Sequence, residues 1–430
     1  CETPDLIGGH MSSPDQEKSD PSNRETPEEE PVGRRIWLTR AVSAMGLTAA
    51  GWIAPALLPA VEQNHTDPTR IPGRMPSPYG SRASTETTQR LTTATHSLTP
   101  HQSLHGIITP SALHFERHHN GVPAIDSDRH RLLIHGLVER PLSFSINNLM
   151  RFPSVTRTMF IECSGNSGKE WKGPTGKTVQ ETHGLMSTSE WTGVPLATVL
   201  TEAGIKPDAT WVLAEGSDAA AMTRSLPLAE VLKDAFLCYA QNGEALRPEQ
   251  GYPLRLVIPG WEGNTCIKWL RRLKLGTDPF MTREETSRYT DLMPDGTARQ
   301  FTFVMEAKSV ITSPSGSQRI EPGFIEIRGL AWSGRGLVKA VEVSTDGGQT
   351  WQPTQLQAPV LSHCHTRFRF GWRWDGEETI LQSRCTDDSG YVQPTRAALV
   401  AARGVHSSYH YNAIQSWKVG RDGQVTNVHV

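Results

Sequence analysis

The hydrophobic pattern of this 430-residue chain changes near residue 300. Before that point, short alternating runs such as residues 159–162 mix with brief helical patterns such as residues 196–204. After it, alternating runs are separated by tight turns, for example the Asp-Gly-Gly at 346–348. The chain is also rich in turn-formers, with 37 glycines and 30 prolines. These patterns predict an α+β fold class, in which a mixed domain is followed by an all-β sandwich of immunoglobulin size.

The first sixty residues indicate targeting rather than fold. Residues 1–33 are acidic and nearly devoid of apolar side chains, which predicts a disordered leader. Arg34 and Arg35 precede a short apolar run broken by Pro55 and Pro59, a pattern typical of a twin-arginine export signal. The alternative is an N-terminal membrane anchor, but the short, interrupted run favours a cleaved signal. We therefore expect a periplasmic protein with no membrane attachment after cleavage, and a mobile linker over residues 61–105.

Charge and cysteine content exclude several functions. The 43 basic and 45 acidic residues leave no basic surplus that would indicate nucleic-acid binding. No CxxCH motif is present, so we expect no c-type haem on this chain. Apart from Cys1 there are five cysteines, so at least one is unpaired in an oxidising compartment. Cys364 and Cys385 could pair, but spacing does not test this.

Three segments carry residues suited to ligand chemistry. In residues 160–168, Cys163 stands where a strand meets a turn rich in Gly, Ser and Asn, which lets a backbone approach a ligand closely. Taken alone, such a cysteine is more often a small buried hydrophobe. Further on, Arg255 interrupts an apolar strand and Lys268 follows a glycine-bearing loop, a combination suited to a phosphate group. Residues 115–123 form a third, charged loop.

At these three segments the chain resembles the sulfite oxidase family of molybdopterin enzymes, from about residue 104 to the C-terminus. The resemblance implies a molybdopterin-binding catalytic domain over residues 106–300 and an immunoglobulin-like dimerisation domain over residues 301–430. It implies one molybdenum held by one pterin and by the thiolate of Cys163, a soft ligand suited to this metal. Arg117 is expected to face the oxyanion substrate, and Arg335 to reach the active site from the loop at 332–336. The residues implied to bind the cofactor are Phe115, Arg117, His119, Cys163, Asp218, Gln250, Arg255, Cys266, Ile267 and Lys268; Gln250 replaces a histidine that is common in the family.

Within the family, the sequence is similar to the molybdenum subunit of sulfane dehydrogenase, the SoxC type. Residues 114–119, 241–244 and 269–272 carry this likeness. Met222 stands in place of the site tyrosine of sulfite oxidases, and Gly168 in place of an arginine. The resemblance implies that the substrate is a cysteine persulfide on a sulfur-carrier protein, oxidised at its outer sulfur with oxygen from water. It also implies transfer of electrons to a c-type cytochrome subunit and a homodimer within a heterotetramer.

Other interpretations remain open at this point. The chain could be a sulfite dehydrogenase that converts sulfite to sulfate with cytochrome c as acceptor. Residues 344–351 fit the Asp-box of sugar-binding propellers, but the motif occurs once and a propeller needs several copies. His406 and His410 are spaced by four residues, which we interpret as a surface pair because no third metal ligand is nearby.

Overall fold

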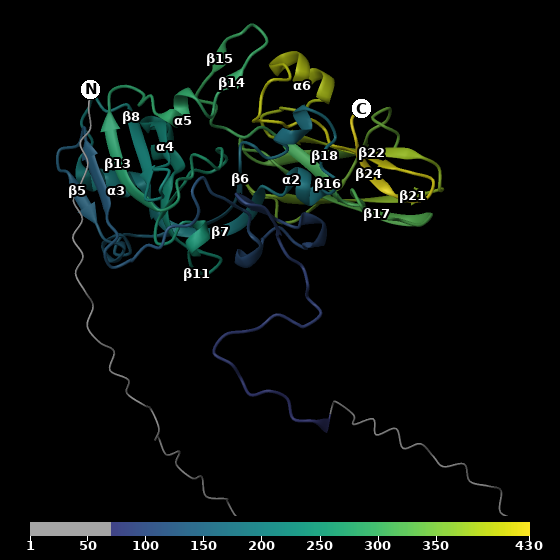
Figure 1. The fold of residues 1–430 in the computed structure, drawn as a ribbon, viewed down its shortest axis with the longest axis horizontal. Helices are drawn as coiled ribbons and strands as arrows, with labels where there is room; N and C mark the ends of the chain where they lie inside the picture. The colour runs from purple at the N-terminus through teal and green to yellow at the C-terminus, as the bar shows by residue number, and fades with distance from the viewer. Residues whose placement is uncertain (1–69) are drawn as a thin grey trace, which may run out of the picture. The chain divides into compact units, whose positions relative to one another are not determined.

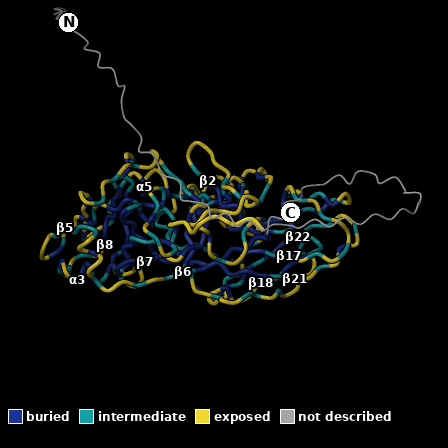
Figure 2. Tube along the Cα trace, turned by 90° about the horizontal axis from the view of Figure 1, so that it is seen from below, coloured by how far each residue is buried: buried dark blue, intermediate teal, exposed yellow. Residues whose placement is uncertain are grey.

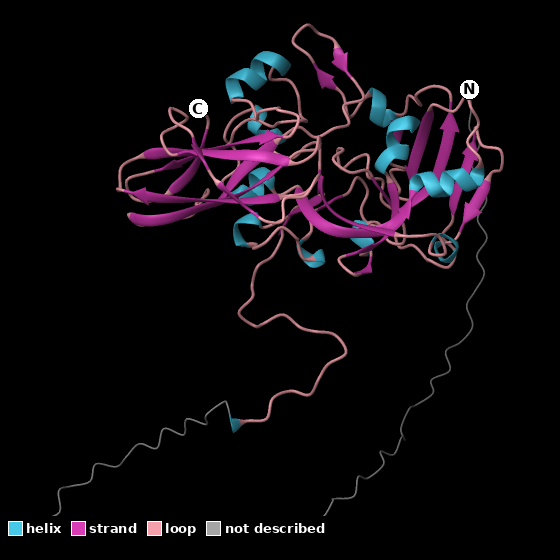
Figure 3. Ribbon diagram, turned by 180° about the vertical axis from the view of Figure 1, so that it is seen from behind, coloured by secondary structure: helices cyan, strands magenta, loops and turns pink. Residues whose placement is uncertain are grey.

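The structure, a computed structural model, describes residues 70–430, and strands dominate it (Figure 1; Figure 3). The predicted leader and twin-arginine signal lie outside the described residues. Within the described part of the chain, every helix is too short or too polar to cross a membrane. Residues 81–430 form one compact unit.

The linker predicted over residues 61–105 is too long at its C-terminal end. Strands β1 (Leu91–Thr92) and β2 (His96–Leu98) form a small sheet with β3 (Glu116–Arg117), in the order β1-β2-β3. Residues 97–101 are buried. Their polar composition suggested a loop, but pairing with β3 and the burial of Leu98 place them within the fold.

Two sheets build the half of this unit that precedes residue 300. The first has the order β11-β10-β7-β6, and β12 also pairs with β10. The second has the order β5-β4-β13-β8-β9, in which β4 and β13 run parallel and the other pairs antiparallel. The strands are β4 (Leu132–Gly136), β5 (Leu142–Phe144), β6 (Val155–Glu162), β7 (Met186–Pro195), β8 (Trp211–Gly216), β9 (Thr223–Pro227), β10 (Phe236–Gln241), β11 (Glu244–Ala245), β12 (Arg255–Val257) and β13 (Leu270–Gly276).

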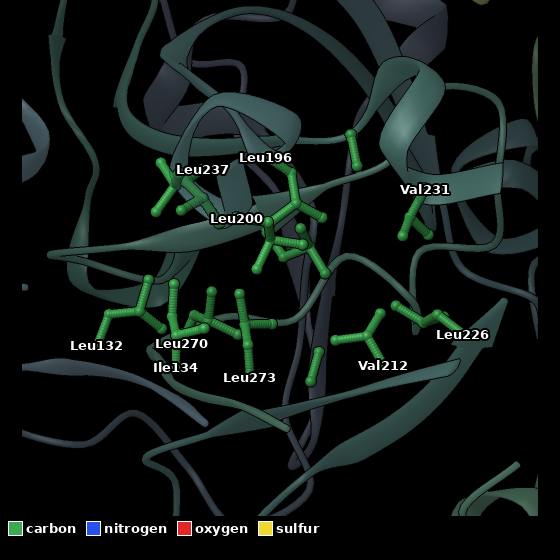
Figure 4. Packing of buried hydrophobic residues seen from close by; sticks show 14 of the residues in the cluster. Leu132, Ile134, Leu196, Leu200, Val212, Leu226, Val231, Leu237, Leu270 and Leu273 are labelled. Atoms are coloured by element: carbon green, nitrogen blue, oxygen red, sulfur yellow. The ribbon is translucent and has the colours of Figure 1, made fainter. Parts of the chain in front are cut away.

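Short helices complete this half, and the sequence predicted the two longest. Helix α3 (Leu196–Ala203) buries Leu196, Val199 and Leu200, and it ends at Gly204, whose φ of 70° suits glycine. Helix α4 (Leu228–Asp234) begins after Pro227. Both helices pack on the second sheet to form a leucine- and valine-rich core (Figure 4). The remaining helices are α1 (Ile146–Leu149), α2 (Val179–His183) and α5 (Arg283–Thr286).

The C-terminal half is the predicted sandwich of two antiparallel sheets. One has the order β16-β17-β21-β20 and the other β19-β18-β22-β23-β24. The turn at 346–348 joins β18 to β19, and Gly347 and Gly348 take positive φ there. The elements of this half are β16 (Lys308–Ser313), β17 (Gly323–Trp332), β18 (Val338–Ser344), β19 (Gln352–Pro353), β20 (Gln355–Gln357), β21 (Thr366–Trp374), β22 (Thr379–Asp387), α6 (Arg396–Arg403), β23 (Ser416–Val419) and β24 (Val425–Val428). Before them, β14 (Asp291–Leu292) and β15 (Ala298–Arg299) pair as a separate two-stranded sheet.

Strand β6 belongs to both halves. Met159 and Ile161 pack in a core with Trp191, whereas Phe160 packs in the core of the sandwich, so both faces of the strand end are buried (Figure 2). The last residue of the strand, Glu162, is fully buried and pairs with Lys308 of β16 at 2.8 Å. The alternation of residues 159–162 correctly predicted a strand. It did not indicate that the face carrying Phe160 and Glu162 would be covered by the core of the sandwich.

We expect the Glu162–Lys308 pair to stabilise the contact between the two halves. Lys308→Met should lower the free energy of unfolding by about 3–5 kcal/mol, because it leaves a buried carboxylate without its counter-charge. Lys418→Met is the matched control, since Lys418 pairs with Glu378 in an exposed position; its cost should stay below about 1 kcal/mol. Urea unfolding followed by tryptophan fluorescence measures both, and equal losses would contradict this role.

Candidate active site

The structure brings ten of the eleven predicted site residues to one cavity. The residues implied to bind the cofactor all line it, namely Phe115, Arg117, His119, Cys163, Asp218, Gln250, Arg255, Cys266, Ile267 and Lys268. They come from five separate segments between residues 115 and 268, so the sheets gather them rather than any local spacing. Asn264, Met222 and Tyr289 complete much of the remaining wall.

Cys163 directly follows β6, at the junction of the strand and its turn. Its backbone N–H donates to the Leu185 carbonyl at 2.9 Å, and its carbonyl accepts from the Asn166 N–H at 2.8 Å. These bonds fix the position of the thiol on the cavity wall. Burial raises the pKa of the Cys163 thiol, and the Arg117 guanidinium acts in the opposite direction. A cation at this position would favour the thiolate.

Arg255 is buried and Lys268 is half-buried, and neither cation forms an ion pair within the described part of the chain. Arg255 donates to the backbone and side-chain oxygens of Gln250, both at 3.2 Å, while its Nε has no partner among the described residues. Lys268 Nζ bonds to the carbonyls of Arg117 and Glu249 and to His118. Burial, followed by the neighbouring Arg255, lowers the pKa of Lys268 well below its usual value. Two largely enclosed basic side chains without a carboxylate partner in residues 70–430 form a site that favours an anionic ligand.

The loop that carries Phe115 to His119 is held from both sides. Gln250 Nε2 donates to the Phe115 carbonyl at 2.8 Å, so Gln250 links this loop to Arg255. Phe115 N–H donates to Ser187 of β7 at 3.1 Å. The Arg117 side chain bonds back to the His118 carbonyl. Arg117 and Lys268 thus bind carbonyls of the loop itself, and a bound phosphate would take over these hydrogen bonds.

The other predicted residues occupy less charged positions. Asp218 accepts from the Met222 N–H at 3.0 Å, which shapes the turn before β9. The Cys266 sulfur accepts from the Ile258 N–H at 3.4 Å, and burial raises the pKa of this thiol. Ile267 anchors the segment through its carbonyl, which accepts from Leu256 N–H at 2.9 Å. All five described cysteines are free, including Cys364 and Cys385.

A wider cavity, of about 900 Å³, opens beside the first. Arg117, His119, Cys163 and Tyr289 line both cavities. The wall of the wider one carries four exposed basic side chains, those of Lys169, Lys177, Arg283 and Arg288. The first cavity measures only about 80 Å³ with its basic side chains folded inward.

Tyr289 is a site residue that the sequence did not indicate. Its hydroxyl lies 3.3 Å from His119 Nε2, and its ring lies 5.3 Å from that of Tyr409, which lines the wider cavity. Burial raises the pKa of Tyr289, so the phenol stays protonated at neutral pH. It follows helix α5 with no motif around it, and no spacing distinguishes it from an ordinary core aromatic.

Arg335 is the predicted residue that does not line the Cys163 cavity. It is exposed, and its guanidinium lies 5.9 Å from the centre of the Tyr391 ring. It lines a separate hollow of about 340 Å³, shared with Thr302 and His410. The interpretation of His410 as a surface residue is wrong. His410 is buried against Glu262, because the chain turns inward after His406, which is exposed.

These features test the fit of a molybdopterin cofactor. A pterin phosphate is an anion, and Arg255 and Lys268 are cavity-lining basic residues without a carboxylate partner in the described residues. A soft metal prefers a thiolate, and Cys163 is held on the wall of the same cavity. The residues present therefore fit the group, with the phosphate facing Arg255 and Lys268 and the metal facing Cys163.

Comparisons with known proteins agree with this chemistry. Residues 119–284 match the model of the oxidoreductase molybdopterin binding domain, and residues 299–417 match that of the Mo-co oxidoreductase dimerisation domain. Mitochondrial sulfite oxidase of Rattus norvegicus is 32% identical over 330 residues, which cover 70% of this chain and 60% of the relative. Sulfite oxidase of Gallus gallus is 31% identical, and the match covers 70% of this chain and 71% of the relative.

One solved structure is similar over most of the chain. The sulfane dehydrogenase SoxCD from Paracoccus pantotrophus is 46% identical, with a TM-score of 0.82. The match covers 84% of this chain and 96% of that chain. The present chain spans about 60% of the length of the mammalian relatives.

We expect removal of both cavity-lining cations, Arg255 and Lys268, to prevent cofactor retention. Charge-assisted hydrogen bonds contribute about 1.5–3 kcal/mol each, so Arg255→Gln with Lys268→Gln should weaken cofactor binding by roughly 100-fold or more. Metal analysis of the purified variant should find little molybdenum. The matched control is Arg157→Gln with Lys233→Gln, which removes one Arg and one Lys from exposed ion pairs. Full molybdenum occupancy in the first variant would contradict the assignment.

Proposed function

Because the chain belongs to the sulfite oxidase family of molybdenum oxidoreductases, we propose that it oxidises sulfur carried by another protein. The substrate is the cysteine persulfide of a sulfur-carrier protein, and its outer sulfur receives oxygen from water. Electrons leave to a c-type cytochrome subunit. We place the enzyme in the periplasm after export by the twin-arginine route, as a homodimer within a heterotetramer, with one pterin per molybdenum and no haem on this chain.

The width of the cavity beside Cys163 carries this proposal. A volume of about 900 Å³ far exceeds what a free sulfur oxyanion needs, and it suits a cysteine-bearing tail inserted from a carrier protein. Met222 stands in place of the site tyrosine of sulfite oxidases, and Gly168 in place of an arginine. Both changes remove groups that would bind a small dianion. The likeness to the sulfane dehydrogenase SoxCD, at 46% identity, supports the same substrate class.

Each residue has a separate task in this proposal. Arg255 and Lys268 would neutralise the pterin phosphate, and Cys163 would hold the metal as a thiolate. Arg117 lies on the walls of both cavities, so it can bind the developing sulfur oxyanion. Its neighbour His119 is held by Tyr289. When bound, the molybdenum cofactor accepts electrons from sulfur in pairs and releases them singly to haem.

Oxidation of free sulfite is the second candidate. Arg117 and the protonated phenol of Tyr289 line the same small cavity, and together they could bind a sulfur oxyanion. The curated relatives at 31–32% identity are sulfite oxidases. Arg335 does not line the Cys163 cavity in this structure but lines the separate hollow at Thr302. Its position therefore favours neither activity.

We expect Cys163→Ser to reduce turnover to background while the fold persists. A hydroxyl is a poorer ligand for molybdenum than a thiolate, although it is nearly the same size. Turnover per protein and the circular dichroism spectrum measure the two effects. Cys385→Ala is the control, because Cys385 is buried in the sandwich core; it should lose some stability and keep its activity per molybdenum. Wild-type turnover in the serine variant would make Cys163 a structural cysteine.

Comparing substrates tests the proposed function itself. The protein should oxidise persulfidated carrier protein with a higher kcat/KM than free sulfite, and only when a c-type cytochrome is present. Without residues 1–60 the chain has 38 basic and 36 acidic residues, so steering by net charge is weak and the complex should tolerate salt. We expect the cytochrome to co-elute in high salt. Rapid sulfite-dependent reduction of free cytochrome c, with no co-purifying partner, would instead support sulfite dehydrogenase.

A further inference from the structure

Behind the Cys163 cavity lies a buried glutamate that connects to a second, separate hollow. Glu262 is fully buried in the segment between β12 and β13. Asn264, which lines the Cys163 cavity, donates from Nδ2 to Glu262 Oε2 at 2.6 Å and to Ser164 Oγ at 3.0 Å. Glu262 is thus one side chain away from the cavity wall.

On its other side Glu262 contacts a histidine. His410 Nε2 lies 3.4 Å from Glu262 Oε1 and 3.0 Å from Thr302 Oγ1. His410 and Thr302 line the hollow of about 340 Å³ that also holds the exposed residues Arg299 and Arg335. This hollow shares no lining residue with either cavity beside Cys163. Asn264, Glu262 and His410 therefore link the site to solvent by a route independent of substrate entry.

The charges around this pair suit proton exchange near neutral pH. Burial raises the pKa of Glu262 to about 7. The Arg224 guanidinium at 3.8 Å and the hydrogen bonds from Asn264 and Thr302 act in the opposite direction and lower this pKa, but their effect is smaller. Burial lowers the pKa of His410 to about 3, and nearby cations act in the same direction. The charged groups that face this pair are Arg224, Asp291, Arg299, Lys308 and Arg403. Glu262 can thus gain and lose a proton at pH 7. His410 is neutral at this pH, and because its pKa is lowered it would hold a proton only transiently before losing it to solvent.

A water molecule can connect the cavity to Glu262. Arg224 Nη1, Glu262 Oε1 and Asn264 Oδ1 are buried polar atoms without a hydrogen-bond partner in residues 70–430. Their side chains contact one another. Partnerless polar atoms this close together could bind an ordered water. The Asn264 amide orients Glu262 and such a water but carries no proton itself.

We propose that Glu262 and His410 form a proton exit from the Cys163 cavity to the hollow at Thr302. The inference rests on the proposed function: each oxygen atom that passes from water to sulfur releases two protons and two electrons. The electrons leave to the haem protein. The protons need another way out, because the carrier protein fills the wide cavity during turnover. Glu262 takes a proton from the cavity side and passes it to His410, which releases it to solvent.

Two variants and one rescue test the relay. Glu262→Gln keeps the shape of the side chain but cannot carry a proton; kcat should fall by about 100-fold with KM little changed. In the wild type, kcat should rise with pH through about 7, because Glu262 must be ionised to accept a proton. This rise of kcat with pH should be absent in Glu262→Gln. An unchanged kcat and pH profile in Glu262→Gln would overturn the proposal.

His410→Ala enlarges the hollow, so that imidazole can take the place of the lost side chain. We expect a similar fall in kcat that added imidazole restores, and no restoration in the variant that also carries Glu262→Gln. His406→Ala, an exposed position four residues earlier, should behave as the wild type. A loss in His410→Ala that imidazole does not restore at any concentration would reject the relay and indicate a structural role.

Two further measurements separate this proposal from the proposed function. For each oxygen atom transferred, sulfite and the persulfidated carrier both release two protons and two electrons. The variants of Glu262 and His410 are therefore assayed with whichever substrate the wild type oxidises. If it oxidises neither, the proposed function fails. Infrared difference spectra of the holoenzyme without substrate should show a protonated carboxyl that titrates near pH 7 and is missing in Glu262→Gln. Absence of this band from the wild type would reject Glu262 as the proton carrier.

Discussion

The buried carboxylate of Glu162 fixes the geometry around Cys163. It accepts hydrogen bonds from Lys308 at 2.8 Å, from Trp332 at 2.6 Å and from Asn166 at 2.8 Å. Lys308 and Trp332 belong to the sandwich, and Asn166 belongs to the turn after the cysteine. An ionised carboxylate without partners would be too costly to bury, so all three must be in place for the strand end to close. The position of the thiol therefore depends on the sandwich as well as on its own domain.

The site itself presents the opposite electrostatic problem. Glu162 is a buried carboxylate with a charged protein partner. Arg255 and Lys268, in contrast, form hydrogen bonds only with uncharged groups and lie over tryptophan rings in the described chain. A bound phosphate relieves this cost, and a ligand that binds only the folded state also stabilises that state. The cofactor is thus expected to complete the fold as well as the chemistry.

Much of the local structure could be predicted because it depends on neighbouring residues. Gly204 closes α3, Pro227 precedes α4, and Gly347 and Gly348 allow the turn between β18 and β19. The resemblance to a known family supplied the candidate ligands, and ten of these meet at one cavity. Prediction failed where polar residues become buried. The segment at 97–101 was taken for a linker, and His410 for a surface residue.

The sequence by itself determined where strands, helices and turns form and which side chains could hold a metal and a phosphate. These properties follow from backbone preferences and from the chemistry of single residues. Only the tertiary structure decided which buried polar groups meet. Lys308 reaches Glu162 across 146 positions of sequence, Tyr289 reaches His119 across 170, and His410 contacts Glu262. Such pairings arise because packing removes solvent from groups far apart in the chain, and each must then find its partner in space.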